Sequence, residues 1–143
     1  MLNQEQIKEI IPHRDPFLLI DEILELEPGK RAVGMKHVRP EEDYFRGHFP
    51  GQPVMPGVLI LESLAQVGAV AVLCLPENKG KIAFFGGVKE AKFRGMVQPG
   101  DDLRLEAELI KLRSRAGVGS GKAYVGDKLV CECEFMFMFG QDK

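Results

Sequence analysis

Alternation of apolar and polar residues predicts strands in the last third of the chain. In residues 128–139, one face carries Leu129, Cys131, Cys133, Phe135, Phe137 and Phe139. In residues 102–112, one face carries Leu103, Leu105, Ala107 and Leu109. Because successive side chains of a strand point to opposite faces, each segment presents an apolar face to a core. Residues 116–125 are joined to the last strand by Gly126-Asp127, which predicts a hairpin.

Weaker patterns predict further elements in the first two thirds of the chain. Residues 17–27 favour a strand that ends at the turn sequence Pro28-Gly29-Lys30, and residues 31–38 can return as its hairpin partner. Two shorter elements are also expected: a strand over residues 82–88, and a helix that is capped by Asn3 and Gln6 and stops before Pro12.

The most apolar segment, residues 54–75, predicts a buried helix. A membrane-spanning helix needs about 20 apolar residues. However, Glu62 and Gln66 lie inside this segment, and a charge near the bilayer centre costs about 3 kcal/mol. We therefore expect no membrane span. The helix should begin near Gly57, end before Pro76 and be buried on every side, because it is apolar on every side. Glu62 and Gln66 share one of its faces because they are four residues apart.

These elements indicate the fold class of the protein and its association with further copies of the chain. The strand over residues 128–139 can cover the helix with one face, while Met136 and Met138 make the end of its opposite face apolar. That second apolar face needs a covering surface, and another copy of the chain is the expected source. We expect one α+β domain over residues 1–143 that associates with another copy of the chain.

Composition and charge exclude several classes of protein. Hydrophobic residues make up 45% of the chain, too much for intrinsic disorder as the main state. The net charge of −2 gives no support to nucleic-acid binding. The cysteines Cys74, Cys131 and Cys133 are sparse and odd in number, which argues against a disulfide framework. Residues 1–6 lack the pattern of a secretory signal, so a reducing cytoplasmic setting is expected.

Candidate chemistry gathers in residues 47–57, which read Gly-His-Phe-Pro-Gly-Gln-Pro-Val-Met-Pro-Gly. Three of the nine prolines alternate here with three glycines, so the segment should be a stiff, sharply bent loop. It leads into the predicted helix, where N–H groups near Gly57 lack intrahelical partners and attract negative charge. His48 supplies a base, these N–H groups an oxyanion site, and Glu62, about 7 Å further along the helix axis, an acid.

This order of residues resembles the β-hydroxyacyl-acyl-carrier-protein dehydratases of bacterial-type fatty acid synthesis, of the short, non-isomerising type. The Gly-His-Phe-Pro-Gly stretch, followed by Pro-Val-Met-Pro-Gly-Val-Leu and a Glu, is highly specific in order and spacing. The resemblance covers nearly the whole chain, through Ile11-Pro12-His13-Arg14, Pro16 to Asp21, Leu26 to Lys30, Gly47 to Leu61, Lys92-Phe93-Arg94 and Pro99-Gly100-Asp101.

The resemblance implies a hot-dog fold, in which a curled antiparallel sheet wraps one long central helix. It implies active dimers, commonly assembled into hexamers as trimers of dimers, and a site in which His and Glu come from different subunits. The implied roles are catalytic histidine for His48, catalytic carboxylate for Glu62, and donor to the thioester carbonyl for the Gly57 N–H. The implied reaction converts (3R)-3-hydroxyacyl-acyl-carrier-protein to trans-2-enoyl-acyl-carrier-protein in type II fatty acid elongation, without a metal or organic cofactor.

Two further sets of residues are candidates for binding. Substrate contacts are expected from Phe49, Pro56, Leu61 and Gln66. Residues 89–128 hold nine Lys or Arg against six Asp or Glu, whereas residues 1–62 have a net charge of −4. The acyl carrier protein is acidic, so Lys89, Lys92 and Arg94 are candidates for its docking patch. For each of these cations, an ordinary solvated strand face is the alternative.

Other activities remain open at this point. An isomerising relative of the same family typically has Asp where Glu62 stands, and a hot-dog thioesterase would release thiol without dehydration. A non-catalytic acyl-binding module would share the fold alone. A metal site built from His13, His37 and His48 with Cys131-Glu132-Cys133 lacks any recognised zinc spacing.

Overall fold

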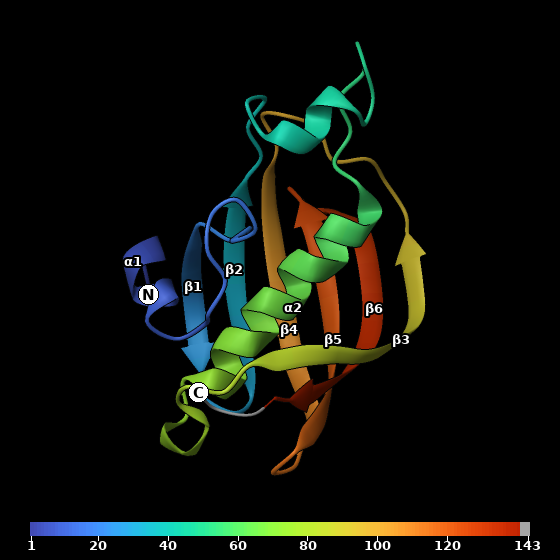
Figure 1. Cartoon of the computed structure of the whole chain (residues 1–143). Coiled ribbons are helices and arrows are strands. Elements are labelled where there is room, and N and C mark those ends of the chain that lie inside the picture. Colours follow the sequence, from blue (N-terminus) through green and yellow to red (C-terminus); the bar gives the residue numbers. More distant parts are fainter. Residues whose placement is uncertain (141–143) are drawn as a thin grey trace.

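The computed structural model describes residues 1–140 and has one antiparallel sheet of six strands that curls around one long helix (Figure 1). The strand order is β1-β2-β4-β5-β6-β3. The strands are β1 (Glu22–Glu27), β2 (Arg31–His37), β3 (Ala83–Phe93), β4 (Asp102–Leu112), β5 (Ala116–Val125) and β6 (Lys128–Phe139). The helices are α1 (Gln4–Lys8) and α2 (Gly57–Leu73), with short 3-10 turns η1 (Asp43–Arg46) and η2 (Pro76–Asn78). This is the α+β hot-dog arrangement expected from the sequence.

The elements with the strongest sequence patterns have the predicted bounds. β4, β5 and β6 begin and end at the predicted residues, and β5 turns into β6 through Gly126, whose φ is +60°. At α1, the predicted cap is a reciprocal pair: the Asn3 side chain accepts from the Gln6 N–H, and the Gln6 side chain accepts from the Asn3 N–H. In these elements, the local sequence pattern is sufficient to predict where each strand or helix begins and ends.

The predicted strand over residues 17–27 is wrong in its first half, because β1 begins only at Glu22. The Leu19 N–H donates to Gln66 Oε1 over 2.9 Å, and the Phe17 carbonyl accepts from Gln66 Nε2 over 2.9 Å. These backbone groups are therefore satisfied by a side chain of α2 rather than by a neighbouring strand. The strand predicted at residues 82–88 is longer than expected and continues to Phe93, which pairs with Cys131 of β6.

The core lies between α2 and the concave face of the sheet. Leu64, Val67 and Val70 of the helix are fully buried, as are Leu103 and Leu105 of β4. Every residue from Gln66 to Leu73 is buried, as predicted. The prediction that the helix is buried on every side is wrong for its first turn, where Val58 is 68% exposed. The first turn of α2 is thus partly exposed to solvent.

The end of β6 is apolar on both faces, as predicted. Phe135 and Phe137 point into the core, whereas Met136 and Met138 are 41% and 54% exposed. β3 forms an edge of the sheet beside β6 and exposes Phe84, Phe85, Val88 and Phe93. This side of the molecule offers a large apolar surface.

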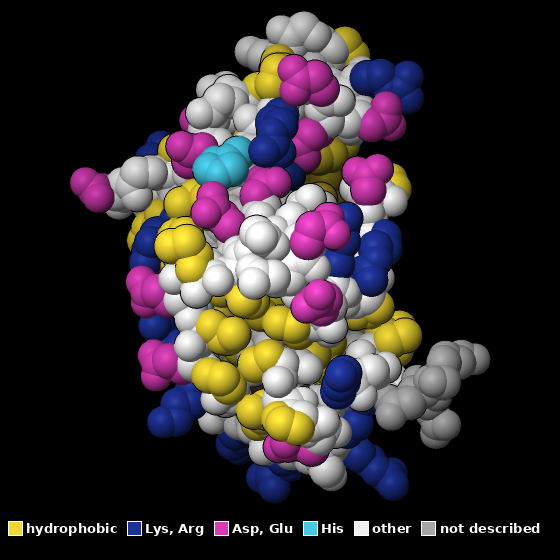
Figure 2. All heavy atoms as spheres, turned by 90° about the vertical axis from the view of Figure 1, so that its left-hand side faces the viewer, with side chains coloured by type: hydrophobic (Ala, Val, Ile, Leu, Met, Phe, Trp, Pro, Cys, Tyr) yellow, Lys and Arg dark blue, Asp and Glu magenta, His cyan; other side chains and the backbone are white. Residues whose placement is uncertain are grey.

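The opposite edge, at α1 and β1, has a different character. On that face, hydrophobic side chains gather below the middle and charged side chains dominate the upper half (Figure 2). The upper end is also where the connection between β2 and α2 projects (Figure 1). Within residues 1–140, no helix is long and apolar enough to cross a membrane.

Candidate active site

The loop between η1 and α2 fixes the ring of His48. The His48 N–H donates to the Tyr44 carbonyl over 3.1 Å, which continues the turn of η1. The ring atom Nδ1 lies 2.7 Å from the carbonyl oxygen of Val54. Because a carbonyl oxygen only accepts, Nδ1 is the donor, and the neutral ring has its lone pair on Nε2. The loop therefore presents Nε2 as a base.

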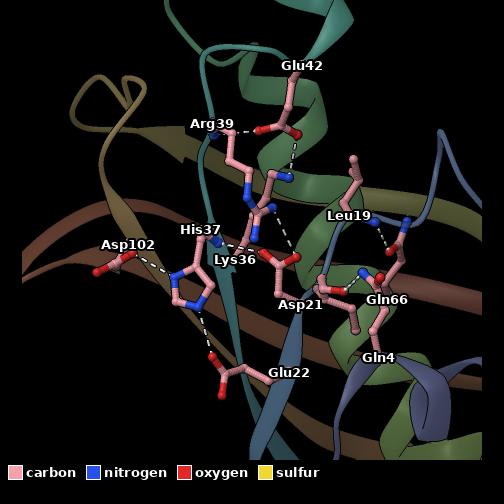
Figure 3. Close-up of polar contacts among 11 residues, drawn as sticks. Gln4, Leu19, Asp21, Glu22, Lys36, His37, Arg39, Glu42, Gln66 and Asp102 are labelled. Atoms are coloured by element: carbon pink, nitrogen blue, oxygen red, sulfur yellow. Dashed lines mark hydrogen bonds and ion pairs between the residues drawn. The ribbon is translucent and has the colours of Figure 1, made fainter.

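Both ends of this loop are anchored in buried structure. At its start, Lys36 Nζ of β2 lies 2.6 Å from Glu42 Oε1, and the Arg39 N–H donates to Glu42 Oε2 over 2.9 Å (Figure 3). At its end, the buried Met55 donates its N–H to the Val97 carbonyl over 2.8 Å. The geometry of His48 thus depends on residues well outside its own turn.

Gly57 begins α2 directly after Pro56, and its position leaves no room for a side chain. A Cβ at residue 57 would lie 2.6 Å from the ring of Phe93 in β3. The first N–H groups of a helix have no intrahelical acceptor, so the backbone at Gly57 offers donors at the positive end of the helix dipole. Phe93 closes one side of this donor site.

Glu62 lies on the next turn of α2, with 17% of its side chain exposed. Its Oε2 accepts from Gln66 Nε2 over 3.1 Å, which confirms the predicted shared face. The same Gln66 amide binds the backbone of Leu19 (Figure 3) and that of Phe17, as described above. His13 also approaches Glu62, with Nε2 3.4 Å from Oε2. Apart from the presence of His13 in the Ile-Pro-His-Arg motif, no pattern in the sequence predicts this contact.

An apolar cavity of about 410 Å³ opens beside this carboxylate. Its polar side chains are Glu62 and His13. Its apolar lining comes from residues 12–17, α2 and the strands β3 and β6, and includes Phe17, Ala69, Val72, Phe85, Phe135 and Phe137. Phe135 and Phe137 thus border this cavity. Among the described residues of one chain, His48 is not part of the lining of this cavity.

A family model described as a FabA-like domain matches residues 11–134, which is most of the chain. The chain belongs to the FabA-like family. This FabA-like chain is 63% identical over 137 residues to a protein of Pelotomaculum thermopropionicum named 3-hydroxyacyl-[acyl-carrier-protein] dehydratase FabZ, covering 96% of this chain and 98% of the relative. A protein of the same name from Bacillus cytotoxicus is 57% identical over 143 residues, covering 100% and 99%. The resemblance found in the sequence is confirmed.

Solved structures support the hot-dog fold of this FabA-like chain. The dehydratase heterocomplex ApeI:P from Xenorhabdus doucetiae superposes with a TM-score of 0.78 at 12% identity, covering 94% of this chain and 91% of that one. Cj0977, a sigma28-regulated virulence protein from Campylobacter jejuni, superposes with a TM-score of 0.72 at 15% identity, covering 95% and 96%. At these identities the likeness concerns the fold alone.

The remaining predicted substrate contacts of the FabA-like chain lie in the loop that carries His48 and along α2. Phe49 is exposed and stacks on the His48 ring, with centroids 4.0 Å apart. Pro56 caps α2, and Leu61 is half-buried against the core. Gln66 is buried, and the bonds described above occupy its amide. Their roles toward substrate stay predictions.

The predicted docking cations occupy β3 and the residue after it. Lys89, Lys92 and Arg94 are exposed. In the register of β3 with β6, Lys89 stands opposite Glu134 and Lys92 opposite Glu132. Arg94 Nε also lies 2.6 Å from Glu132 Oε2. Part of the positive charge is therefore neutralised locally.

The alternative metal site is not assembled. Within residues 1–140, no group of three or more His, Cys, Asp and Glu side chains is arranged to hold a metal ion. His37 lies between Asp102 and Glu22, away from the cysteines. Burial raises the pKa of the Cys131 thiol to about 12 and that of Cys133 to about 11, so both are protonated core thiols.

Proposed function

We propose that this protein dehydrates (3R)-3-hydroxyacyl-acyl-carrier-protein to trans-2-enoyl-acyl-carrier-protein in type II fatty acid elongation, at a site shared by two subunits. The dehydratase activity in fatty acid biosynthesis rests on relatives that are 55–63% identical over nearly the whole chain. The observation that carries the residue roles is the carboxylate of Glu62 on the wall of an otherwise apolar cavity. An acyl chain fits such a cavity, and a carboxyl group on its wall can meet the bound substrate.

The chemistry requires one proton to be removed from C2 and one to be delivered to the hydroxyl on C3. His48 Nε2 takes the C2 proton, and the electrons of that C–H bond form the C2–C3 double bond. As the C3–O bond breaks, Glu62 donates a proton to the departing hydroxyl, which leaves as water. N–H groups near Gly57 hold the thioester carbonyl oxygen while negative charge develops on it. Proton return from His48 to Glu62 through solvent restores the site.

The lining of the cavity beside Glu62 supports a site shared by two subunits. The cavity beside Glu62 has no His48 among its described lining, whereas the β3 edge offers exposed Phe84, Phe85 and Val88 for a second copy. A dimer formed there would bring His48 of one subunit to Glu62 of its partner. We further propose that three such dimers assemble into a hexamer.

The substrate is delivered by the acyl carrier protein, for which Lys89, Lys92 and Arg94 supply a docking patch. Phe49, Pro56, Leu61 and Gln66 stay candidates for substrate contact. We place the enzyme in the cytoplasm, in keeping with its three free cysteines.

Incubation of the purified protein with a 3-hydroxyacyl carrier-protein thioester tests the activity. We expect the substrate to lose one water, detected by mass, with the absorbance of a 2-enoyl thioester. Release of free thiol would instead mean a thioesterase, and tight binding without turnover a binding module. His48→Ala and Glu62→Gln should each lower turnover by roughly 10² to 10⁴. Wild-type turnover by either purified variant would remove that residue from the mechanism.

A further inference from the structure

His13 is the second polar side chain of the cavity, and the dehydration steps above do not use it. It lies in the segment between α1 and β1, and 21% of its side chain is exposed. Its Nε2 approaches Glu62 Oε2 to 3.4 Å. Its Nδ1 is buried and has no hydrogen-bond partner in the part of the chain that the structure describes. The ring therefore has one nitrogen toward the carboxylate and one toward apolar surroundings.

The backbone around His13 is held on both sides by Arg14. Arg14 Nη1 donates to the carbonyls of Ile11 and His13 over 3.0 and 2.7 Å, and Nη2 donates to that of Lys8 over 3.1 Å. The Phe17 N–H then donates to the Arg14 carbonyl over 2.8 Å. The segment that carries His13 is thus fixed by a side chain, although it belongs to no strand.

The surroundings of the ring select its tautomer. A proton on Nδ1 would bury an N–H without an acceptor, which is rare because it costs the full desolvation of the donor. A proton on Nε2 faces the Glu62 carboxylate. His13 therefore carries its proton on Nε2, the opposite of His48, whose Nδ1 donates to Val54.

Two N–H donors then face the same oxygen of Glu62. Gln66 Nε2 lies 3.1 Å from Oε2 and His13 Nε2 lies 3.4 Å from it. An oxygen that faces two donors must act as an acceptor, so a proton on Glu62 belongs on Oε1. Within residues 1–140, Oε1 has no side-chain or backbone donor of its own, which leaves it available to a ligand.

We propose that His13 is a positioning residue that, together with Gln66, keeps Glu62 Oε2 as an acceptor and directs the transferable proton to Oε1. The proposal rests on the role of Glu62 in the proposed function. The separation of 3.4 Å is longer than a formed hydrogen bond. Bonds of this kind are often long in free enzymes and shorten when substrate is bound.

A matched pair of variants tests this role. His13→Leu removes the donor, and His13→Gln keeps an N–H at the reach of Nε2. We expect His13→Leu to lower kcat by roughly 10- to 100-fold with little change in KM, because a misoriented acid affects the reacting state more than the bound substrate. His13→Gln should recover most of the loss. Equal kcat in wild type, His13→Leu and His13→Gln would overturn the proposal, and so would equal losses in the two variants.

The ring itself gives a second readout that does not depend on turnover or on the folding of His13→Leu. The chain has three histidines, so selective ¹⁵N labelling gives few signals. His13 should show the Nε2–H form, and its signals should move in Glu62→Gln. A Nδ1–H form of His13, or signals indifferent to Glu62→Gln, would overturn the proposal.

Failure of the proposed function is distinguishable from failure of this inference. Full turnover by Glu62→Gln would remove the acid itself. If Glu62→Gln were inactive and His13→Leu fully active, Glu62 would keep its role as the acid. Only the positioning role of His13 would then be wrong.

Discussion

Lys36 and Glu42 form an ion pair at the base of the loop that carries His48, with Lys36 buried and Glu42 partly exposed. Lys36 Nζ lies 2.6 Å from Glu42 Oε1, and Lys36 is only 3% exposed. Removing one partner of such a pair leaves the other charge buried without compensation. Because the second oxygen of Glu42 binds the Arg39 N–H, the pair also ties the start of the loop to β2.

Lys36→Met should therefore lower the free energy of unfolding by about 2 kcal/mol, less than for a fully buried pair because Glu42 is partly exposed. It should also lower kcat/KM, because His48 is placed through this loop. Urea unfolding measures the first effect and steady-state kinetics the second. In the double variant Lys36→Met, Glu42→Gln, no lone charge remains, so stability should recover in part. Additive losses in a double-mutant cycle would contradict coupling of the two side chains.

Mixed dimers test whether two subunits share the site. Inactive His48→Ala and inactive Glu62→Ala proteins are mixed under conditions that let subunits exchange, and native mass spectrometry verifies the exchange. Each mixed dimer then has one complete site, and statistical exchange makes half of the dimers mixed. Activity should recover to at most roughly a quarter of wild type. Confirmed mixed dimers without activity would mean that His48 and Glu62 of one chain act together.

Charge reversal at Lys92 and Arg94 tests the docking patch. The double variant should lower kcat/KM for carrier-protein substrates by roughly tenfold or more at low salt, and much less for small thioester mimics. Reversal at Lys30 and Lys79 is a matched control, because these exposed lysines change the net charge equally near the carboxyl end of α2. If the control variant lost as much activity as the Lys92 and Arg94 variant, net charge rather than a patch would be responsible.

His37 should make stability depend on pH. Its Nδ1 lies 2.7 Å from Asp102 Oδ1 and its Nε2 2.9 Å from Glu22 Oε2, and the two carboxylates, Asp102 foremost, raise its pKa (Figure 3). A raised pKa in the folded state stabilises the fold fully below the unfolded value of about 6.5, and this contribution is lost as the pH rises through the folded pKa.

The measurement compares wild type with His37→Gln, which keeps hydrogen bonding but cannot become charged. The difference in the free energy of unfolding should be largest near pH 6 and shrink toward pH 9, remaining under about 1 kcal/mol because the side chain is 40% exposed. If the difference in the free energy of unfolding grew with pH, the pKa of His37 would be lowered rather than raised by folding.

The sequence was sufficient to predict those parts of the structure in which contacting residues are close together along the chain. β6 alternates between core and surface because adjacent residues point opposite ways, and Glu62 meets Gln66 because a helical turn brings them together. The late start of β1 was missed because its cause, Gln66, is 47 residues from Leu19. The approach of His13 to Glu62 joins two segments that only the folded sheet and helix bring together.

Gln66 also sets the minimum length of the acidic side chain at position 62. The amide oxygen of Gln66 accepts from Leu19, and its amide nitrogen donates to Phe17. Because both bonds hold the Gln66 side chain in place, it cannot move toward a shorter acid at position 62. A carboxylate with one methylene fewer would withdraw by about 1.5 Å and lose contact with Gln66. Glu62 and the segment at residues 17–19 are therefore linked through one side chain, and a shorter acid at position 62 would break that link.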